Sequence, residues 1–353
     1  MNSCRRSCLC LLAIWSWLGA QDAPRRITVL SYNIHHGEGT DGRVDLERIA
    51  GVIRAQSPDL VALQEVDRGA RRTGGVNQAQ GLACLLGMDH LFGRTIDYEG
   101  GMYGNAVLTR LPVKGFVNRA LPFTAGREPR GVLQVEVYTG PTESGHFLFR
   151  VFATHLDITE ADRLKAVEAL SNWVAEDPDV PTLLLGDLNA LPGSAPLSGL
   201  VSSGWHIAGR PGAYSTFPAR EPQRQIDYIL FRPAHRWRVL EVWVPEEAVA
   251  SDHRPIAARL ELLPPEDGRW QDQAPPFSSS SRTTASERAA RLCGSCGGIQ
   301  TQAPAWASRR SSPSLSSTQP WSTWTTAAVE AVCSESSSPG AKPNSTTFSR
   351  SSL

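Results

Sequence analysis

The sequence predicts a layered α/β protein, and two patterns carry that prediction. Short apolar runs of strand length recur from about residue 25 to residue 263, and amphipathic segments with helical spacing separate some of them. Roughly eight to ten strands interspersed with a few helices favour stacked sheets and helices over a β-sandwich or a helical bundle. The 353 residues are enough for one large domain or two ordinary ones, with a substantial buried core.

The predicted strands are short runs rich in β-branched and other apolar residues. In residues 132–137 and 147–153 apolar and polar side chains alternate, and the Gly140-Pro141 loop between them indicates a hairpin. The whole set, in chain order, is 26–32, 60–63, 105–108, 132–137, 147–153, 182–185, 226–231, 239–244 and 256–262.

Three segments have the spacing of helices, at residues 44–55, 78–86 and 160–174. Thr159 is placed to cap the start of the third helix. The apolar faces expected for the first and third helices are formed by Val44, Ile49, Val52 and Ile53 and by Leu164, Val167, Leu170 and Val174.

Residues 1–20 have the three-part layout of a signal peptide. Early positive charge is followed by an apolar run at 8–18 and by the small residues Gly19 and Ala20. We therefore expect cleavage near Ala20 and a secreted, periplasmic or otherwise extracytoplasmic protein. The apolar run is shorter than the ~20 residues that span a bilayer. An uncleaved N-terminal anchor is the alternative.

Residues 264–353 are rich in Ser, Thr, Ala and Arg and have no apolar period. Such a segment buries too little apolar surface to offset its chain entropy, so we expect a disordered tail. A second hypothesis is that the tail is a frame-shifted translation, which the coding DNA would decide. Its Cys293-x-x-Cys296 pair lacks the second pair of a zinc site, and Asn344 begins a glycosylation sequon by pattern.

The region at residues 25–263 is predicted to be the functional domain, and its composition argues against a disulfide-stabilised scaffold and against a basic nucleic-acid-binding protein. It contains Cys84 as its one cysteine of the seven, so no internal disulfide framework is expected and packing must supply the stability. It holds 25 Lys and Arg against 28 Asp and Glu, a net of −3. A protein that grips nucleic acid mainly by neutralising phosphates would be basic.

Polar side chains recur where predicted apolar strands end, which predicts that they meet at one edge of a sheet. Taken singly, each has an ordinary structural explanation, such as a salt bridge for Glu65 or a turn cap for Asp187. Their recurrence on one edge favours a site. In chain order they are Asn33, Glu65, Asn105, His155 with Asp157, Asp187 with Asn189, Asp227, and Asp252 with His253.

A divalent cation is the simplest partner for this group of residues. Three or more carboxylates in one cleft repel one another unless a cation neutralises them. The donors are rich in oxygen and lack a Cys/His cage, which favours Mg²⁺ or Mn²⁺, ions that also meet a substrate phosphate. Asp227 is expected to orient His253 and to favour its charged form.

Seven short motifs in unbroken order resemble the endonuclease/exonuclease/phosphatase superfamily, a group of deoxyribonuclease-like metal-dependent hydrolases. The resemblance covers about residues 27–260 and implies a four-layered α/β/β/α sandwich with two mainly antiparallel or mixed sheets packed face to face. The motifs are Ser31-Tyr-Asn33-Ile, Leu63-Gln-Glu65-Val, Gly104-Asn-Ala-Val-Leu, Thr154-His155-Leu, Gly186-Asp187-Leu-Asn189, Gln225-Ile-Asp227-Tyr and Ser251-Asp252-His253-Arg-Pro.

The resemblance also implies a role for each residue. Glu65, Asn33 and Asp252 would bind or steer the metal, while Asp187 and Asn189 would hold the attacking water and a phosphate oxygen. His253, paired with Asp227, would act as general base or as a protonated phosphate clamp. His155 would bind phosphate or assist the leaving group. Asn105 would line the substrate pocket. Arg130, from its position before the strand at 132–137, is expected to contact the phosphate, and a surface arginine is the alternative.

The implied function is hydrolysis of a phosphoester, with three substrate classes open: nucleic acid, lipid or glycolipid head groups, and small soluble phosphoesters. The near-neutral domain argues against tight DNA binding. The start Asn33-Ile-His35-His36-Gly37 also resembles hydrolases that remodel lipid anchors. The alternative from another class of protein is a non-catalytic module that binds a phosphate ligand. Such a module is expected to have lost some of the site residues named above, and this sequence retains them. No protein partner is inferred, and a monomer is expected.

Overall fold

The computed structural model describes residues 25–139 and 147–265. The predicted leader at 1–20, nearly all of the predicted tail, the Cys293-x-x-Cys296 pair and the sequon at Asn344 lie outside the described residues. They stay predictions.

One six-stranded sheet has the strand order β11-β12-β1-β2-β4-β3. Strands β1 and β2 run parallel, and the other neighbours in the sheet are antiparallel. The parallel pair matters for the site because its two carboxyl ends leave the sheet at the same edge. The strands are β1 (Arg25–Asn33), β2 (Leu60–Arg68), β3 (Asp89–Tyr98), β4 (Gly101–Thr109), β11 (Trp237–Trp243) and β12 (Ile256–Leu262).

The second six-stranded sheet has the order β5-β6-β7-β8-β10-β9. Strands β7 and β8 are its parallel pair, and the hairpin predicted around Gly140 is the antiparallel pair β6–β7. Both sheets are therefore mixed, as the sequence implied. The strands are β5 (Val113–Ala120), β6 (Gly131–Tyr138), β7 (Leu148–His155), β8 (Thr182–Asp187), β9 (His206–Ile207) and β10 (Asp227–Arg232).

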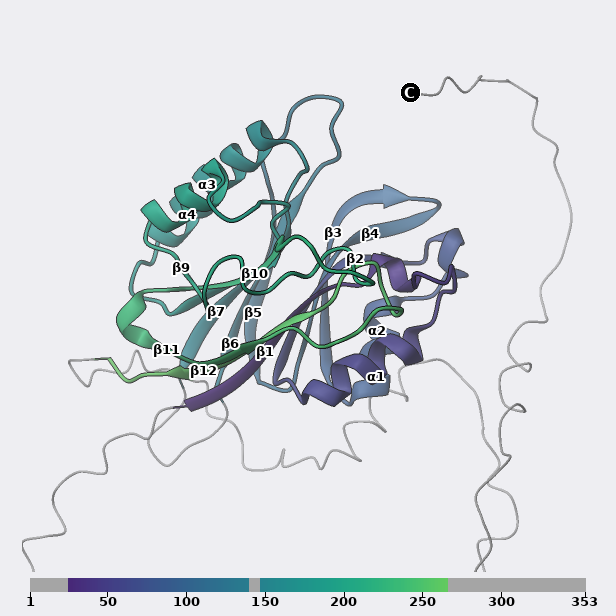
Figure 1. Cartoon of the computed structure of the whole chain (residues 1–353), viewed down its shortest axis with the longest axis horizontal. Coiled ribbons are helices and arrows are strands. Elements are labelled where there is room, and N and C mark those ends of the chain that lie inside the picture. The colour runs from purple at the N-terminus through teal and green to yellow at the C-terminus, as the bar shows by residue number, and fades with distance from the viewer. Residues whose placement is uncertain (1–24, 140–146, 266–353) are drawn as a thin grey trace, which may run out of the picture. The chain divides into compact units, whose positions relative to one another are not determined.

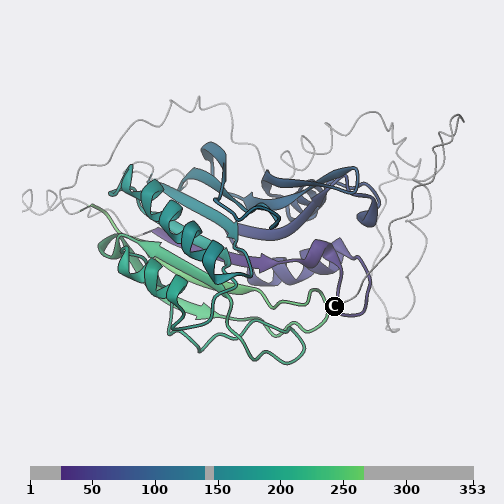
Figure 2. The ribbon, with the colours of Figure 1, turned by 90° about the horizontal axis from the view of Figure 1, so that it is seen from above.

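The two sheets pack face to face and helices cover their outer faces, so the predicted four-layered α/β/β/α arrangement is confirmed (Figures 1 and 2). Apolar side chains from both sheets, such as Val29 and Val151, form the core between them. Helices α1 (Leu46–Gln56) and α2 (Gln78–Leu86) pack on the first sheet. Helices α3 (Glu160–Ala175) and α4 (Ala195–Ser202) pack on the second.

Strands β3, β5 and β9 and helix α4 were not predicted. Strands β3, β5 and β9 are edge strands, and the side chains of β3 and β5 are largely exposed or half-buried, so the apolar pattern that reveals a central strand is weak there. Phe116 and Val117 of β5 are exposed. The structure also contains short 3-10 helices, η1 (His35–Gly37), η2 (Arg71–Thr73) and η3 (Ala234–Arg236).

The three predicted helices form within two residues of their expected ends. Val44 and Leu164, expected on buried faces, are exposed, because helix α1 begins two residues after Val44 and Leu164 faces solvent. Thr159 occupies the N-cap position of α3, but its hydroxyl donates to Oδ1 of Asp157 over 2.6 Å rather than accepting from the helix.

Two further observations concern the described part of the chain. Within residues 25–139 and 147–265 no helix is both long enough and apolar enough to pass through a membrane. Over the same ranges Cys84 takes part in no disulfide.

Candidate active site

The register of the second sheet places three site residues side by side. His155 is the last residue of β7 and pairs with Asp187, the last residue of β8. On the other side of β8, Asp187 pairs with Asp227, the first residue of β10. Neighbouring strands lie about 4.8 Å apart, so one edge of the sheet carries an imidazole and two carboxylates in a row.

Asp187 is the centre of the site. Its buried Oδ2 atom accepts a hydrogen bond from Nδ2 of Asn33 at 3.2 Å. The same oxygen lies 3.5 Å from Nε2 of His155 and 3.7 Å from Nε2 of His253. Asn33 ends β1 of the first sheet, so Asp187 is where the two sheets meet at this edge. Burial, and next the charge of Asp227, raise the pKa of Asp187 to about 7.

His253 forms a dyad with Asp227. Its Nδ1 atom lies 2.9 Å from Oδ2 of Asp227, and a carboxylate only accepts, so Nδ1 carries the proton. Burial by itself lowers the pKa of His253. The charges of Asp227 and Asp187 outweigh that effect and raise the pKa to about 10. In the metal-free protein the ring is therefore an imidazolium at neutral pH.

Glu65 does not end its strand, contrary to the prediction. Strand β2 continues to Arg68, and the register with β4 shifts between Leu63 and Val66, which marks a β-bulge at Glu65. Its φ of 60° lies in the left-handed region, which costs a non-glycine residue of order 1–3 kcal/mol. The bulge re-aims the carboxylate: Oε1 accepts from Nδ2 of Asn33 at 2.9 Å.

A second polar chain leads outward from His155. Nδ2 of Asn189 lies 3.1 Å from Nε2 of His155, and Nη1 of Arg130 lies 3.1 Å from Nδ1. The amide of Asn189 and the guanidinium of Arg130 are both hydrogen-bond donors, whereas a neutral imidazole has one accepting nitrogen. The ring of His155 can therefore accept from only one of them at a time. Burial, and next the charge of Arg130, hold the pKa of His155 well below its usual range. Arg130 also pairs with Glu128 at 3.0 Å.

Three residues singled out in the sequence lie differently from expectation. Asn105 sits within β4, not at its end, and its amide donates to the carbonyl of Gly131 at 3.0 Å, which joins the two sheets. Asp252 is half-buried beside Ser251, whose hydroxyl lies 3.4 Å from Oδ1. Neither histidine–carboxylate cluster of the described residues includes Asp252. Asp157 pairs with Arg127 at 2.9 Å and caps the turn before α3.

The structure adds residues that the sequence pattern did not reveal. Thr216 donates to the same Asp227 oxygen that His253 uses, at 2.5 Å. Ser251 donates to the carbonyl of Asn33 at 2.7 Å and so fastens the His253 loop to β1. Tyr103 lies near Glu65 and Arg130, and burial raises its pKa above the usual range, so its hydroxyl stays protonated. Thr216 lies in a loop without periodicity, and nothing in its neighbours distinguishes it.

The donor atoms at this edge suit a cation. Asp187 and Asp227 are paired across neighbouring strands, and Asn33 links Asp187 to Glu65. Asp227 keeps one buried oxygen, Oδ1, without a hydrogen-bond partner. The described residues contain two clusters of possible metal ligands, and within each cluster the ligand atoms lie within 4.8 Å of one another. One cluster is Asp187, Asp227 and His253, and the other is His35, His36 and Glu65. Oxygen-rich clusters with unpaired buried atoms are stabilised by a divalent ion.

The chain is similar to known proteins over the region that carries this site. Residues 30–253 match the family described as Endonuclease/Exonuclease/phosphatase family. The uncharacterized protein YbhP of Escherichia coli K12 is 32% identical over 259 residues, which cover 66% of this chain and 96% of that protein.

Solved structures show the same fold. An endonuclease/exonuclease/phosphatase from Beutenbergia cavernae matches with a TM-score of 0.55 at 27% identity, over 69% of this chain and 76% of that one. A mannosyl-6-phosphatase from Bacteroides thetaiotaomicron matches with a TM-score of 0.56 at 20% identity, over 66% of this chain and 99% of that one.

Proposed function

The chain belongs to the endonuclease/exonuclease/phosphatase family, and from that premise we propose that it is a divalent-metal-dependent phosphoesterase, one that cleaves a phosphodiester or a phosphomonoester by attack of water. Members of this family are generally hydrolases of phosphoesters and typically depend on a divalent metal. What is proposed beyond the family is the chemistry of this chain's own residues, the metal and the substrate.

The observation that carries the proposal is the position of Asp187. Its Oδ2 atom is within 3.7 Å of a ring nitrogen of both His155 and His253 and of the amide of Asn33. Phosphoryl transfer needs a positioned nucleophile, a proton acceptor and donors that stabilise the developing charge. Asp187 with Asn189 would hold the water and accept its proton, and the raised pKa suits that task at neutral pH.

The imidazolium of His253 would donate to a phosphate oxygen through Nε2, while Asp227 holds the ring through Nδ1. Its raised pKa favours the phosphate clamp over the general base, the two roles that the sequence left open. Arg130 would contact a second phosphate oxygen, and His155 would steer the leaving group.

Glu65 and Asn33 would hold the metal, which we propose to be Mg²⁺ or Mn²⁺. Such an ion supplies neutralisation of the phosphate charge and orientation of the substrate. The fit rests on the carboxylate of Glu65, which the β-bulge at φ 60° aims toward Asn33. Asp252 would act at longer range through its negative charge, which contributes to the raised pKa of His253.

We further propose that the protein acts outside the cytoplasm, on the strength of the signal-peptide layout at residues 1–20. A panel of phosphoesters separates the three substrate classes: plasmid DNA, sphingomyelin and phosphatidylinositol vesicles, nucleotides and sugar phosphates, each with Mg²⁺ or Mn²⁺ and with EDTA. We expect one class to be turned over and the Asp187→Asn variant to be inactive on it. If the protein binds a phosphate ligand but turns over no substrate, the enzyme interpretation is wrong and the non-catalytic module is favoured.

A further inference from the structure

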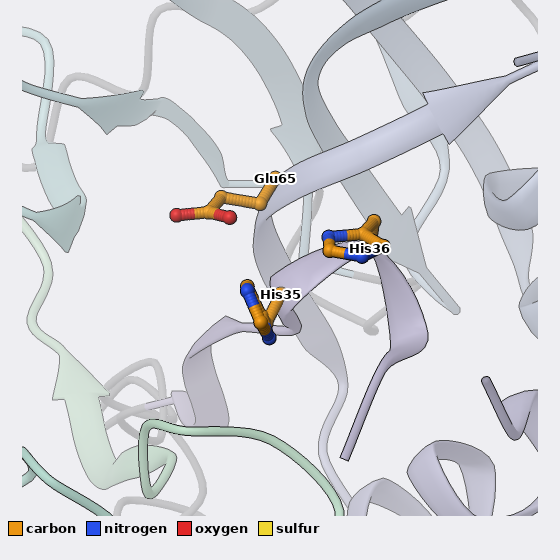
Figure 3. Close-up of side chains that lie close together, drawn as sticks. All are labelled: His35, His36 and Glu65. Carbon is orange, nitrogen blue, oxygen red and sulfur yellow. The ribbon is translucent and has the colours of Figure 1, made fainter. Parts of the chain in front are cut away.

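Two adjacent histidines after β1 face the carboxylate of Glu65, and neither has a role in the proposed hydrolysis. The rings of His35 and His36 lie edge to face with centroids 4.5 Å apart. One nitrogen from each ring and one oxygen of Glu65 all lie within 4.8 Å of one another. The three side chains surround the same space (Figure 3).

Glu38 determines which nitrogen of each neutral ring keeps a free lone pair. Nδ1 of His35 lies 3.2 Å from the backbone carbonyl of Glu38, and a carbonyl only accepts, so Nδ1 carries the hydrogen of the neutral ring. Nε2 of His36 lies 3.3 Å from the carboxylate of Glu38 and carries the hydrogen there. The lone pairs left over are on Nε2 of His35 and Nδ1 of His36. Histidines that bind metals commonly donate their other nitrogen in this way.

Nδ1 of His36 is an acceptor that the protein does not use. The atom is buried and has no hydrogen-bond partner, and its side chain is only 10% exposed. A buried acceptor left unpaired is unfavourable unless a ligand fills it. The backbone at His36 is held in place by Gln78, whose Nε2 donates to the carbonyl of His36 at 2.6 Å.

The charges around the pair permit a cation. The guanidinium of Arg72, whose charge acts on His36, is neutralised by two hydrogen bonds of 2.8 Å to Asp67. On the other side, Oε1 of Glu65 accepts from Asn33 and lies 3.9 Å from Nδ1 of His155. Its second oxygen makes no hydrogen bond to any residue that the structure describes, so one carboxylate can serve both Asn33 and the histidine pair.

We propose that His35, His36 and Glu65 form a binding site for a divalent transition-metal ion of the Zn²⁺ type, beside the phosphoester site. Two imidazoles and one carboxylate are the protein ligands of many zinc centres, which keep a further position for water. Imidazole nitrogen suits such ions, whereas Mg²⁺ prefers oxygen ligands throughout. The site shares Glu65 with the metal of the proposed hydrolysis, while its two imidazoles go beyond that reaction and take no part in it.

The test is metal binding by the full-length protein after removal of metal with EDTA and dialysis. Co²⁺ is the probe, because its visible absorption reports bound nitrogen ligands, and Zn²⁺ displaces it in competition. We expect one such Co²⁺ per chain, retained in a large excess of Mg²⁺. The variants His35→Asn and His36→Asn should bind at least about 10-fold more weakly, and Glu38→Ala about 10- to 100-fold more weakly, as for other outer partners of metal-bound histidines.

Asparagine is chosen because it tolerates the positive φ angles of His35 and His36, 45° and 44°. His206→Asn is the matched control, since His206 lies exposed in β9 of the other sheet. Equal thermal unfolding of all variants in EDTA excludes a folding defect. Wild-type protein that shows no nitrogen-bound Co²⁺, or variants that bind it as well as wild type, would overturn the site.

Loss of the metal site and loss of the proposed function are separate outcomes. Unaltered Co²⁺ binding in the variants together with hydrolysis of a phosphoester removes this site and leaves the enzyme. Variant-sensitive Co²⁺ binding in a protein that hydrolyses no phosphoester keeps this site and removes the enzyme.

Discussion

His253 donates a hydrogen bond from Nδ1 to Oδ2 of Asp227 over 2.9 Å, although 26 residues separate them in the chain. The bond leaves Nε2 directed at Asp187, 3.7 Å away. A ring held between two buried carboxylates keeps its proton well above the pH at which a free histidine loses it.

The first prediction concerns that proton. In the metal-free protein, NMR titration of the His253 ring should give a pKa near 10, since the charges of Asp227 and Asp187 outweigh burial. In Asp227→Asn the leading charge is gone and the pKa should fall by more than one unit. A His253 ring that titrates near 6.5 in both proteins would contradict the electrostatic account. Activity should fall roughly 10²- to 10⁴-fold in either Asp227→Asn or His253→Ala.

The second prediction concerns stability in the absence of metal. Because burial and Asp227 raise the pKa of Asp187 from 3.8 to about 7, the folded state prefers the protonated acid. That stabilisation is complete below the unfolded value and is lost as the pH rises through about 7. Asp187→Asn has no charge to bury, so its melting temperature in EDTA should exceed that of wild type more at about pH 8 than at about pH 5. A constant difference between the two pH values would refute the assignment.

The third prediction separates Arg130 from a surface arginine. Its guanidinium reaches Nδ1 of His155 at 3.1 Å and is mostly buried, as a phosphate-binding group in a pocket would be. Arg130→Ala should raise KM for a phosphoester at least about 10-fold and raise the pKa of His155, whose proton the charge now repels. Arg127→Ala is the control, since Arg127 pairs with Asp157 in the loop before α3. If the two variants have equal effects on KM, Arg130 does not contact the substrate and its role is structural.

The fourth prediction concerns Asn105, which the sequence placed in the substrate pocket. Its amide donates to the buried carbonyl of Gly131 and joins β4 to β6. Asn105→Ala should lower the free energy of unfolding by about 1–3 kcal/mol, because that carbonyl loses its partner. Urea unfolding measures this. An unchanged free energy of unfolding with a raised KM would instead place Asn105 on the substrate.

Much of the fold could be predicted because the central strands and the helices have recognisable patterns of apolar residues. Strand β12 and helix α2 begin and end where the sequence placed them, since β12 is buried at all positions but one and α2 buries one face with helical spacing. Edge strands such as β5 were missed because solvent on one side leaves no such pattern. The order of the strands within each sheet depends on long-range pairing, which local periodicity does not contain.

Some of the residues that the sequence singled out lie together at one edge of the structure, but their geometry could not be predicted. Asn33, His155 and Asp187 do end strands, so the rule of polar residues at strand ends found them. Glu65 sits in a β-bulge with positive φ, which leaves no trace in the spacing of residues. The metal site proposed at His35 and His36 could not be predicted from the sequence, because it depends on contacts with Glu38. The backbone carbonyl of Glu38 determines the tautomer of His35, and its carboxylate determines that of His36.

The most direct test of the central claim is the hydrolysis of bis-p-nitrophenyl phosphate by the metal-depleted protein, measured before and after addition of Mg²⁺ or Mn²⁺. We expect no turnover without metal, turnover on addition, abolition by EDTA, and a loss of at least about 10²-fold in a folded Asp187→Asn variant. Turnover that is unaffected by EDTA, or that Asp187→Asn retains in full, would contradict a metal-dependent site centred on Asp187.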